Sequence, residues 1–287
     1  MQGFLQKLLS RGAYPSALLL APVLGFVAMN LGAHPGLVLV ATTVATIAFV
    51  ALLERAIPYR DAWTHNHGDV ATDSLFGVSS LLVPALWRGV ADGLGITAAT
   101  FLPSGLWPSE LPIVVQVAIA FVIADLGAWA GHRLVHRVPL LWRFHEVHHS
   151  VRRLYWLNSQ HFHPLDLTLI HAASVTPLLL LGVGPEVLVL AASLSTVNAL
   201  FQHCNARVEA GPLNWIFSTA QLHRWHHVHD ADYGHANYGA GLIVWDVLAG
   251  TRRLPTDAVP DDLGAQPFPR RFWQQLLRPF SNKEVSR

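Results

Sequence analysis

The chain has 287 residues, of which 52% are hydrophobic and only 13% are charged. Typical soluble domains carry about 25% charged residues, so this composition indicates a protein embedded in a membrane. The net charge of +1 gives no basis for nucleic-acid binding, and the single cysteine excludes an intramolecular disulfide, a cysteine-based zinc ribbon and a cysteine-ligated iron–sulfur cluster. That residue, Cys204, is expected to be a small buried packing residue.

Two apolar runs, residues 17–33 and 36–53, follow a short basic N-terminal segment, with only a turn between them. A cleaved signal peptide begins in a similar way. A membrane span needs roughly 17–25 residues, so two adjacent runs of this length favour a helical hairpin in the membrane. The polar and aromatic stretch 54–69 then reads as a surface connection.

Three further apolar regions complete the predicted helices. Residues 73–95 contain Pro84 and Arg88, and are expected to form either a kinked span or a helix along the membrane interface. Residues 111–131 form a clear span. The short runs 167–181 and 185–200 predict a second hairpin, which could also be re-entrant.

Histidines are concentrated in three short groups, and the chain has 17 of them against 18 acidic residues. Residues i, i+3 and i+4 share one face of a helix, so each group is expected to present its imidazoles as a single array. Imidazole is a common ligand for zinc, copper, iron and nickel. Eight such side chains exceed what one tetrahedral metal needs, which predicts a two-metal site. The groups are His132 and His136; His145, His148 and His149; and His223, His226 and His227.

These groups, HRLVH, HEVHHS and HRWHH in that order between apolar helices, resemble the fatty acid hydroxylase/sterol desaturase superfamily of membrane di-iron enzymes. The likeness covers roughly residues 115–251 and includes QHFHP, QHCN, NYG and the later WD and GT. The resemblance implies that the eight histidines bind two iron ions, with His163 and His203 as additional candidate ligands. It also implies that Asn237 and Tyr238 of NYG lie near the site, where they support ligands or close the cavity.

Asp125 interrupts the span 111–131, seven residues before His132 and on the same helix face. A carboxylate at membrane depth is costly and is usually paired or functional. We expect it to accept a hydrogen bond from a metal-ligating imidazole. The alternative is a polar side chain bonded to a neighbouring helix.

The resemblance implies O2-dependent oxidation, most of all hydroxylation, of an unactivated C–H bond in a lipid or sterol-like substrate. The chain has no Gly-rich dinucleotide fingerprint, so electrons must come from a separate donor. The family implies a cytochrome b5-like or ferredoxin partner reduced by NAD(P)H. Two other functions remain open. HEVHH also matches the HExxH motif of zinc proteases, with Glu146 as the base, and a histidine-rich bundle could bind or transport metal without catalysis.

The expected fold is all-α: a multi-pass membrane helical bundle with a cytosolic, histidine-rich di-metal cap. It divides into N-terminal membrane helices (1–110), a catalytic domain (111–251) and a basic amphipathic tail (252–287). If both hairpins and the pair 73–95/111–131 open to one side, that side receives 18 of the 19 Lys and Arg residues, all except Arg88. The positive-inside rule makes this side cytosolic. High Ala, Leu and Arg usage suits a bacterial cytoplasmic membrane.

Overall fold

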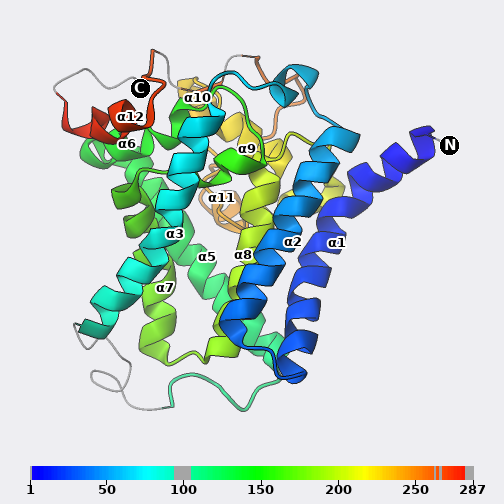
Figure 1. Ribbon diagram of the computed structural model, residues 1–287, viewed down its shortest axis with the longest axis vertical. Coiled ribbons are helices and arrows are strands. Elements are labelled where there is room, and N and C mark those ends of the chain that lie inside the picture. Colours follow the sequence, from blue (N-terminus) through cyan, green and yellow to red (C-terminus); the bar gives the residue numbers. More distant parts are fainter. Residues whose placement is uncertain (1, 94–104, 262, 265–266, 282–287) are drawn as a thin grey trace.

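The computed structural model describes residues 2–93, 105–261, 263–264 and 267–281. Six long helices run side by side along the long axis of the molecule, and short helices and loops gather at one end, which we call the cap (Figure 1). All six are long and apolar enough to cross a membrane. They are α1 (Gln2–Asn30), α2 (Pro35–Ala56), α3 (Val70–Gly93), α5 (Ile113–Arg137), α7 (Pro164–Leu181) and α8 (Pro185–His203).

The described part contains no β-sheet, only three isolated bridges, so the predicted all-α, multi-pass membrane bundle is confirmed. The segment expected at 73–95 forms α3, which lies alongside the other long helices (Figure 1); residues 94–95 fall outside the described part. The two short runs of the second hairpin extend into α7 and α8, of 18 and 19 residues. Both are therefore long enough to span the membrane with local thinning of the bilayer.

Helices α5 and α7 approach closely because α5 carries two glycines one turn apart. A Cβ built on Gly127 would lie 2.1 Å from the carbonyl oxygen of Ala173, and one on Gly131 would lie 3.4 Å from the Cα of Ile170. Small residues at this spacing let the backbones of two membrane helices pack against each other. The contact sets the position of the last turns of α5, where the first two histidines lie.

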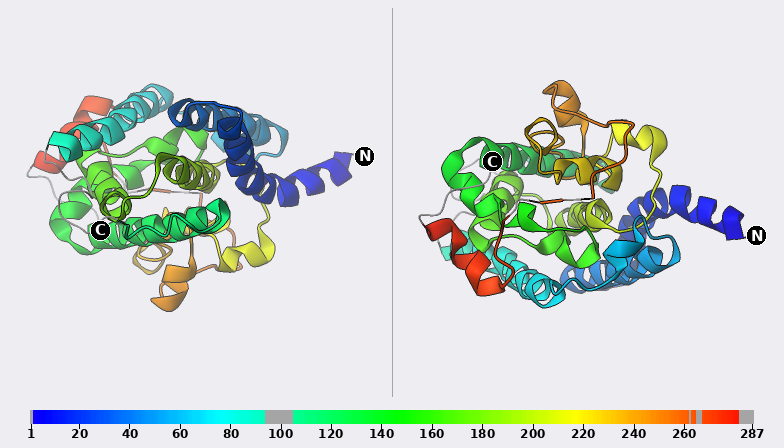
Figure 2. Two further views of the ribbon diagram at one scale, coloured as in Figure 1. Left: turned by 90° about the horizontal axis from the view of Figure 1, so that it is seen from below. Right: turned by 90° about the horizontal axis from the view of Figure 1, so that it is seen from above.

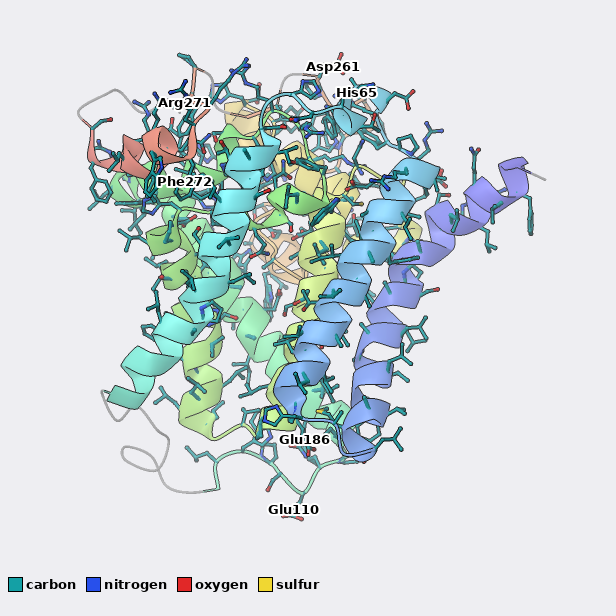
Figure 3. All side chains as sticks on the ribbon, viewed as in Figure 1. His65, Glu110, Glu186, Asp261, Arg271 and Phe272 are labelled. Carbon is teal, nitrogen blue, oxygen red and sulfur yellow. The ribbon has the colours of Figure 1, made fainter. Side chains whose placement is uncertain are left out.

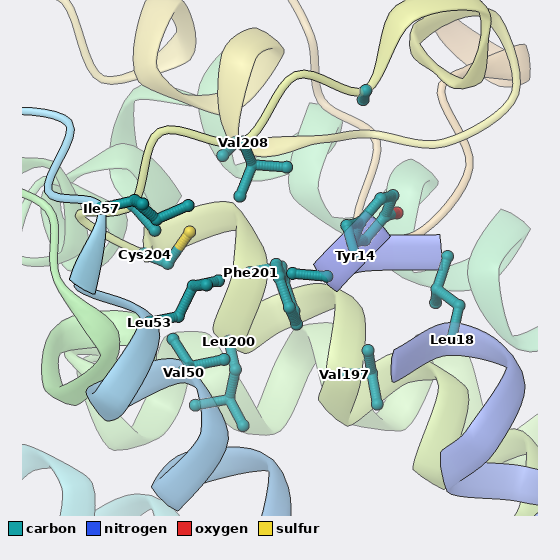
Figure 4. Close-up of a cluster of buried hydrophobic side chains, with 14 residues drawn as sticks. Tyr14, Leu18, Val50, Leu53, Ile57, Val197, Leu200, Phe201, Cys204 and Val208 are labelled. Carbon is teal, nitrogen blue, oxygen red and sulfur yellow. The ribbon is translucent and has the colours of Figure 1, made fainter. Parts of the chain in front are cut away.

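A cluster of apolar side chains joins α1, α2 and α8 beneath the cap (Figure 4). Tyr14 and Phe201 pack with ring centroids 5.2 Å apart, and the Tyr14 hydroxyl donates to Asn198. Cys204 lies in this cluster with 0% of its surface exposed, and burial raises the pKa of its thiol to about 12. It is a buried packing residue, as its sequence context predicted.

The cap is built from short helices that come from several parts of the chain, with long helices between some of them. They are η1 (Asp61–Thr64), α6 (Pro139–His145), η2 (His148–Ser150), η3 (Trp156–Gln160), η4 (Gly211–Trp215), α9 (Ala220–His226), α10 (Ala231–Gly234), α12 (Phe272–Leu277) and η5 (Arg278–Phe280). A further short helix, α11 (Val244–Leu248), lies beside the middle of α5, where Trp245 donates to Asp125. His65, Asp261 and Arg271 mark the cap end in Figure 3, and Glu110 and Glu186 mark the opposite end. The tail expected to begin at residue 252 folds back onto the cap as far as residue 281, and residues 282–287 lie outside the described part.

Candidate metal centre

Nine buried histidines converge in two adjacent clusters inside the cap end of the bundle. Within each cluster, the ligand atoms all lie within 4.8 Å of one another. The imidazoles of His149 and His227, one from each cluster, stack with centroids 4.6 Å apart, so the clusters share a wall. The first cluster holds His132, His136, His145, His149 and His226; the second holds His148, His203, His223 and His227.

The structure divides two of the three sequence groups between these clusters. His132 and His136 lie together on the last turns of α5, as expected. The second group does not form one helical array, because α6 ends at His145 and the chain re-enters a 3-10 turn at His148. His148 therefore turns to the second cluster, whereas the other two histidines of its group face the first.

The third group is also divided, although most of it is helical. His223 and His227 are four residues apart and share the face of α9 that lines the second cluster. His226 is offset from His227 by about 100° around the helix axis and faces the first cluster. The expectation of one array per group is therefore wrong for the second and third groups, because each of them passes between the two clusters.

The hydrogen bonds around the first cluster assign the tautomers of its imidazoles. His132 Nδ1 lies 2.8 Å from the carbonyl oxygen of Tyr238, and His226 Nδ1 lies 2.7 Å from that of Ala236. A carbonyl oxygen only accepts, so each Nδ1 carries the proton and each Nε2 carries a lone pair. The same holds for His145, whose Nδ1 lies 2.8 Å from Asp166 Oδ2.

These lone pairs point at one another. His132 Nε2 lies 3.0 Å from both His145 Nε2 and His226 Nε2. In the second cluster, His223 Nε2 lies 3.0 Å from His203 Nε2 and 3.1 Å from His227 Nε2. Two lone pairs cannot hydrogen-bond each other, but a cation between them is coordinated by both. The donor set therefore fits a metal ion in each cluster.

The spacing of the nitrogens also fits shared binding of one metal ion by neighbouring imidazoles. Two nitrogens about 2.1 Å from one metal lie about 3.0 Å apart at a right angle and about 3.4 Å apart at the tetrahedral angle. The observed separations of 3.0–3.1 Å are therefore short enough for neighbouring imidazoles to share one metal ion. In addition, both ring nitrogens of His136 are buried without a hydrogen-bond partner, as are Nδ1 of His223 and Nδ1 of His227. One nitrogen of His136 is therefore free to bind a metal, whereas His223 and His227 carry the ring proton on Nδ1 when Nε2 is the ligand atom.

Burial keeps the cap imidazoles neutral. It is the main reason why the pKa values of His148, His149, His223 and His227 lie well below their ordinary value, and neighbouring imidazoles lower them further. Burial likewise lowers the pKa of His226 to about 3. Only the neutral imidazole binds a metal, so the clusters hold their histidines in the binding form at physiological pH.

His163 lies outside both clusters, contrary to the expectation that it is a ligand. Its Nδ1 accepts a hydrogen bond from the amide of Leu165 at the start of α7, and its Nε2 lies 3.1 Å from the carbonyl oxygen of Leu276. The His-Pro pair is therefore a helix N-cap followed by proline at the first helical position. His203, the other additional candidate, does lie in the second cluster.

Asp125 does not bond to an imidazole. Its Oδ2 accepts hydrogen bonds from the backbone amide of Leu242, at 3.0 Å, and from the indole Nε1 of Trp245, at 2.8 Å. The expected carboxylate–imidazole contact is therefore not formed at this position, because the segment after NYG packs against α5 and supplies both donors. The carboxylate that does bond to a clustered imidazole belongs to Asp166.

The NYG segment lies beside the first cluster. The carbonyl of Tyr238 accepts from His132, and the Tyr238 amide donates to Asp246, as does the amide of Gly239. Asn237 adopts a left-handed φ of 57°, and its side chain bonds to the carbonyls of Leu222 and Arg253. Asp246, the acid of the WD pair, therefore holds the loop that orients His132.

Sequence reasoning missed a hydrogen-bonded group behind the second cluster. His161 Nδ1 lies 2.6 Å from Asp73 Oδ1, and its Nε2 lies 2.7 Å from Gln275 Oε1. The carbonyl of His161 lies 3.3 Å from His148 Nδ1, and Asn158 Oδ1 lies 3.0 Å from His203 Nδ1. These residues come from α3, η3 and α12, which are far apart in the sequence. The only signal was the presence of His161 in QHFHP.

A multi-pass membrane bundle that buries two clusters of neutral imidazoles has the make-up of a membrane metalloenzyme. The family described as fatty acid hydroxylase matches residues 117–251. The ornithine lipid hydroxylase OlsE of Rhizobium tropici is 35% identical over 246 residues, which cover 83% of this chain and 74% of the relative. The chain belongs to the fatty acid hydroxylase/sterol desaturase superfamily and is an oxidoreductase of the fatty acid hydroxylase type.

Other relatives match about half of the chain. Human alkylglycerol monooxygenase is 29% identical over 140 residues, which are 49% of this chain and 31% of the relative. Methylsterol monooxygenase 2-2 of Arabidopsis thaliana is 26% identical over 157 residues, which are 52% of this chain and 58% of the relative. No solved structure matches the chain.

Proposed function

We propose that the protein hydroxylates an unactivated C–H bond of a membrane lipid, using O2 at a histidine-ligated di-iron centre. The observation that carries the proposal is the pair of adjacent buried clusters in which imidazole lone pairs converge. The ligands we propose are the five histidines of the first cluster and the four of the second. The reaction balances as C–H plus O2, two electrons and two protons giving C–OH and water.

Iron in these clusters would supply oxygen activation, because imidazole-ligated iron with open positions reacts with O2. The protein orients the ligands through acceptors on their Nδ1 atoms, including the Asp166 carboxylate and the Tyr238 carbonyl. Aromatic rings exclude water from the clusters. Phe162 stacks on His148 at 3.9 Å, and Trp142 packs on His136 at 5.0 Å.

The relatives support a lipid as the substrate. The one that this chain covers most fully is named for hydroxylation of ornithine lipids, and the others are named for alkylglycerols and methylsterols. These names share a polar headgroup or ring system with an apolar portion, and they favour hydroxylation over desaturation. An apolar helical bundle suits such a substrate, because the lipid reaches the cap from within the membrane.

Electrons must come from a separate protein, and we propose a cytochrome b5-like or ferredoxin donor that is reduced by NAD(P)H. The charge distribution supports a cytosolic cap in a bacterial cytoplasmic membrane, because 18 of the 19 Lys and Arg residues belong to segments that open to one side. A reporter fused to the C-terminus should be accessible from the cytosol. A reporter accessible only from outside would overturn this orientation.

The central test combines metal analysis with lipid analysis. The purified protein should contain close to two iron ions per chain, and cells that express it should accumulate a lipid heavier by one oxygen atom. Growth under 18O2 should place the label in that lipid. Cells expressing a variant with His226→Ala and His223→Ala are the control. Iron-free protein, or an unchanged lipid profile in the presence of iron-loaded protein, would reject the proposal.

A further inference from the structure

Four exposed apolar side chains form a patch on the side of the bundle, beside α5. We call it the lateral patch: Trp215 is 59% exposed, Ile216 48%, Val247 39% and Leu248 75%. The two segments are joined, because the Ile243 amide donates to the carbonyl of Ile216 at 3.0 Å. Figure 2 shows the orange segment that contains α11 projecting from the bundle in both end views. Membrane contact of residues 215–216 and 247–248 was not predicted from the sequence.

The depth of the lateral patch follows from its attachment to α5. Asp125, which binds Leu242 and Trp245, lies 12 residues from each end of Ile113–Arg137, or about 18 Å along the helix axis. The helix is about 37 Å long and the hydrocarbon core about 30 Å thick. Even if the whole excess length lies at the cap end, Asp125 is about 11 Å below the headgroups along that axis. The segment bonded to it is then at the level of the acyl chains.

Several backbone groups of this segment have hydrogen-bond partners within the protein, as burial in lipid requires. Asp125 accepts from the Leu242 amide, and the carbonyl of Gly241 accepts from Ser218 at 2.8 Å. The amides that end α11 also have partners: Ala249 donates to Trp245 at 2.9 Å, and Thr251 donates to Asp246 at 2.8 Å. The indole N–H of Trp245 donates a hydrogen bond to the Asp125 carboxylate.

One cation marks the edge of the patch nearest water. The Arg252 guanidinium lies 3.8 Å from the ring centroid of Trp215, and its Nε donates to the carbonyl of Asn214. Long basic side chains place their charge at the headgroups while their stems and aromatic neighbours face lipid, and indole rings are enriched at the same level. The patch therefore has a cation and an indole ring at the edge nearest the cap and apolar side chains below them. This order is expected for a surface that enters the membrane from the cap side.

We propose that the lateral patch inserts into the acyl-chain region of the bilayer, so that α11 is a membrane-embedded element in addition to the six long helices. The patch continues the lipid-facing surface of α5, where Val122 is 41% exposed and Leu126 43% exposed beside Asp125. Its occupant is therefore the lipid that surrounds α5. The proposal depends on the membrane placement of α5 and not on the metal or the reaction.

Insertion would connect the bilayer to the first histidine cluster. Asp246 directly precedes Val247 in α11 and binds the amides of Tyr238 and Gly239. The Tyr238 carbonyl in turn holds the Nδ1 proton of His132. Lipid packing against α11 therefore stabilises the loop that orients a metal-ligating imidazole.

Site-directed fluorescence tests the insertion. The only native cysteine, Cys204, is fully buried, so a single bimane label can be placed on Leu248→Cys in the full chain reconstituted into vesicles. Leu126→Cys on α5 is the matched lipid-facing control, and Asp257→Cys, an exposed cap residue, is the aqueous control. Val247→Cys provides a second label position if Leu248→Cys does not fold.

We expect phospholipids brominated on their acyl chains to quench the Leu248 label as strongly as the Leu126 label, and aqueous iodide to quench it severalfold less than the Asp257 label. Efficient iodide quenching without quenching by brominated lipid would place the patch in water and overturn the proposal. Shielding from both quenchers would indicate a protein partner, and would overturn it as well.

Discussion

His145 and Asp166 form a buried pair that links two helices at the first histidine cluster. The Nδ1 atom of His145, the last residue of α6, lies 2.8 Å from Asp166 Oδ2 in the first turn of α7, and neither side chain is exposed. Because a carboxylate accepts the Nδ1 proton, the Nε2 lone pair of His145 faces the cluster. The acid therefore decides whether His145 can bind a metal.

Asp166→Asn should weaken metal binding at the first cluster by about 10–100-fold, because an amide can present an N–H to Nδ1 and favour the other tautomer. The measurement is a competition titration of the purified protein with a chelator. Glu209→Gln is the matched control, since Glu209 is an exposed acid paired with Arg11 far from the histidines. Equal affinity in the Asn variant and the control would show that Asp166 does not orient the ligand.

Single histidine variants should separate the two clusters. His226→Ala should remove metal from the first cluster only, and His223→Ala from the second only, so each protein should retain about one metal per chain. His163→Ala should retain both metals, because both of its ring nitrogens are used at the start of α7. Metal content per chain, measured by mass spectrometry, shows which histidines are needed for each metal. Loss of metal in the His163 variant without loss of folding would contradict the assignment.

Gln275 should matter although it lies beyond the part that matches the family. Its Nε2 donates to the carbonyl of Pro269 at 2.8 Å, so its Oε1 accepts from His161, whose carbonyl lies 3.3 Å from His148 Nδ1. Gln275→Leu removes this acceptor and should weaken metal binding at the second cluster by about tenfold. The exposed neighbour Gln274→Leu is the control. An unchanged affinity and an unchanged iron spectrum in the Gln275 variant would contradict this role.

Asp125→Ala should destabilise the protein and leave its metal content intact. The substitution leaves two buried donors, the Leu242 amide and the Trp245 indole, without their acceptor, at a cost of about 1–3 kcal/mol each. Thermal unfolding in detergent measures the loss, with Asp257→Ala as an exposed control. A variant as stable as the control but deficient in metal would instead indicate that Asp125 supports a ligand.

The fold could be predicted well from the sequence because its strongest signals are local. Apolar runs of membrane length specify helices whatever their partners, and the short second hairpin needed only a few more residues at its ends. The histidine groups were also visible, because their spacing is regular. The division of these groups between two clusters could not be predicted, because it depends on where α6 ends and on which side of α9 each cluster lies.

The supporting residues could not be predicted because they come from distant segments. Asp73, His161 and Gln275 form one hydrogen-bonded group although they lie on α3, after η3 and on α12. Conversely, the spacing of Asp125 and His132 correctly places both on one helix, but the segment 241–245 reaches the carboxylate. Helical periodicity gives the face of a residue, and only the tertiary packing decides which partner meets it.

Glu146 distinguishes oxidation from hydrolysis, because HEVHH has the residues of a zinc-protease motif. His145 and His149 lie in a cluster with three further histidines, and His148 lies in the other cluster, whereas one hydrolytic zinc needs three protein ligands and an open position. Glu146 is 1% exposed. If it were a hydrolytic base, Glu146→Gln would lower turnover by roughly 10²–10⁴-fold, because positioned acid–base groups contribute that much.

We expect Glu146→Gln to retain both metals and at least about a tenth of the O2-dependent lipid oxidation, because oxygen activation depends on metal and electrons rather than on a carboxylate base. The control is Glu209→Gln, measured in the same membranes with the same electron donor. Lipid oxidation under O2 and peptide cleavage without O2 are assayed in parallel. Peptide cleavage that needs no O2 and disappears in the Glu146→Gln variant would favour a protease and reject the hydroxylase assignment for this site.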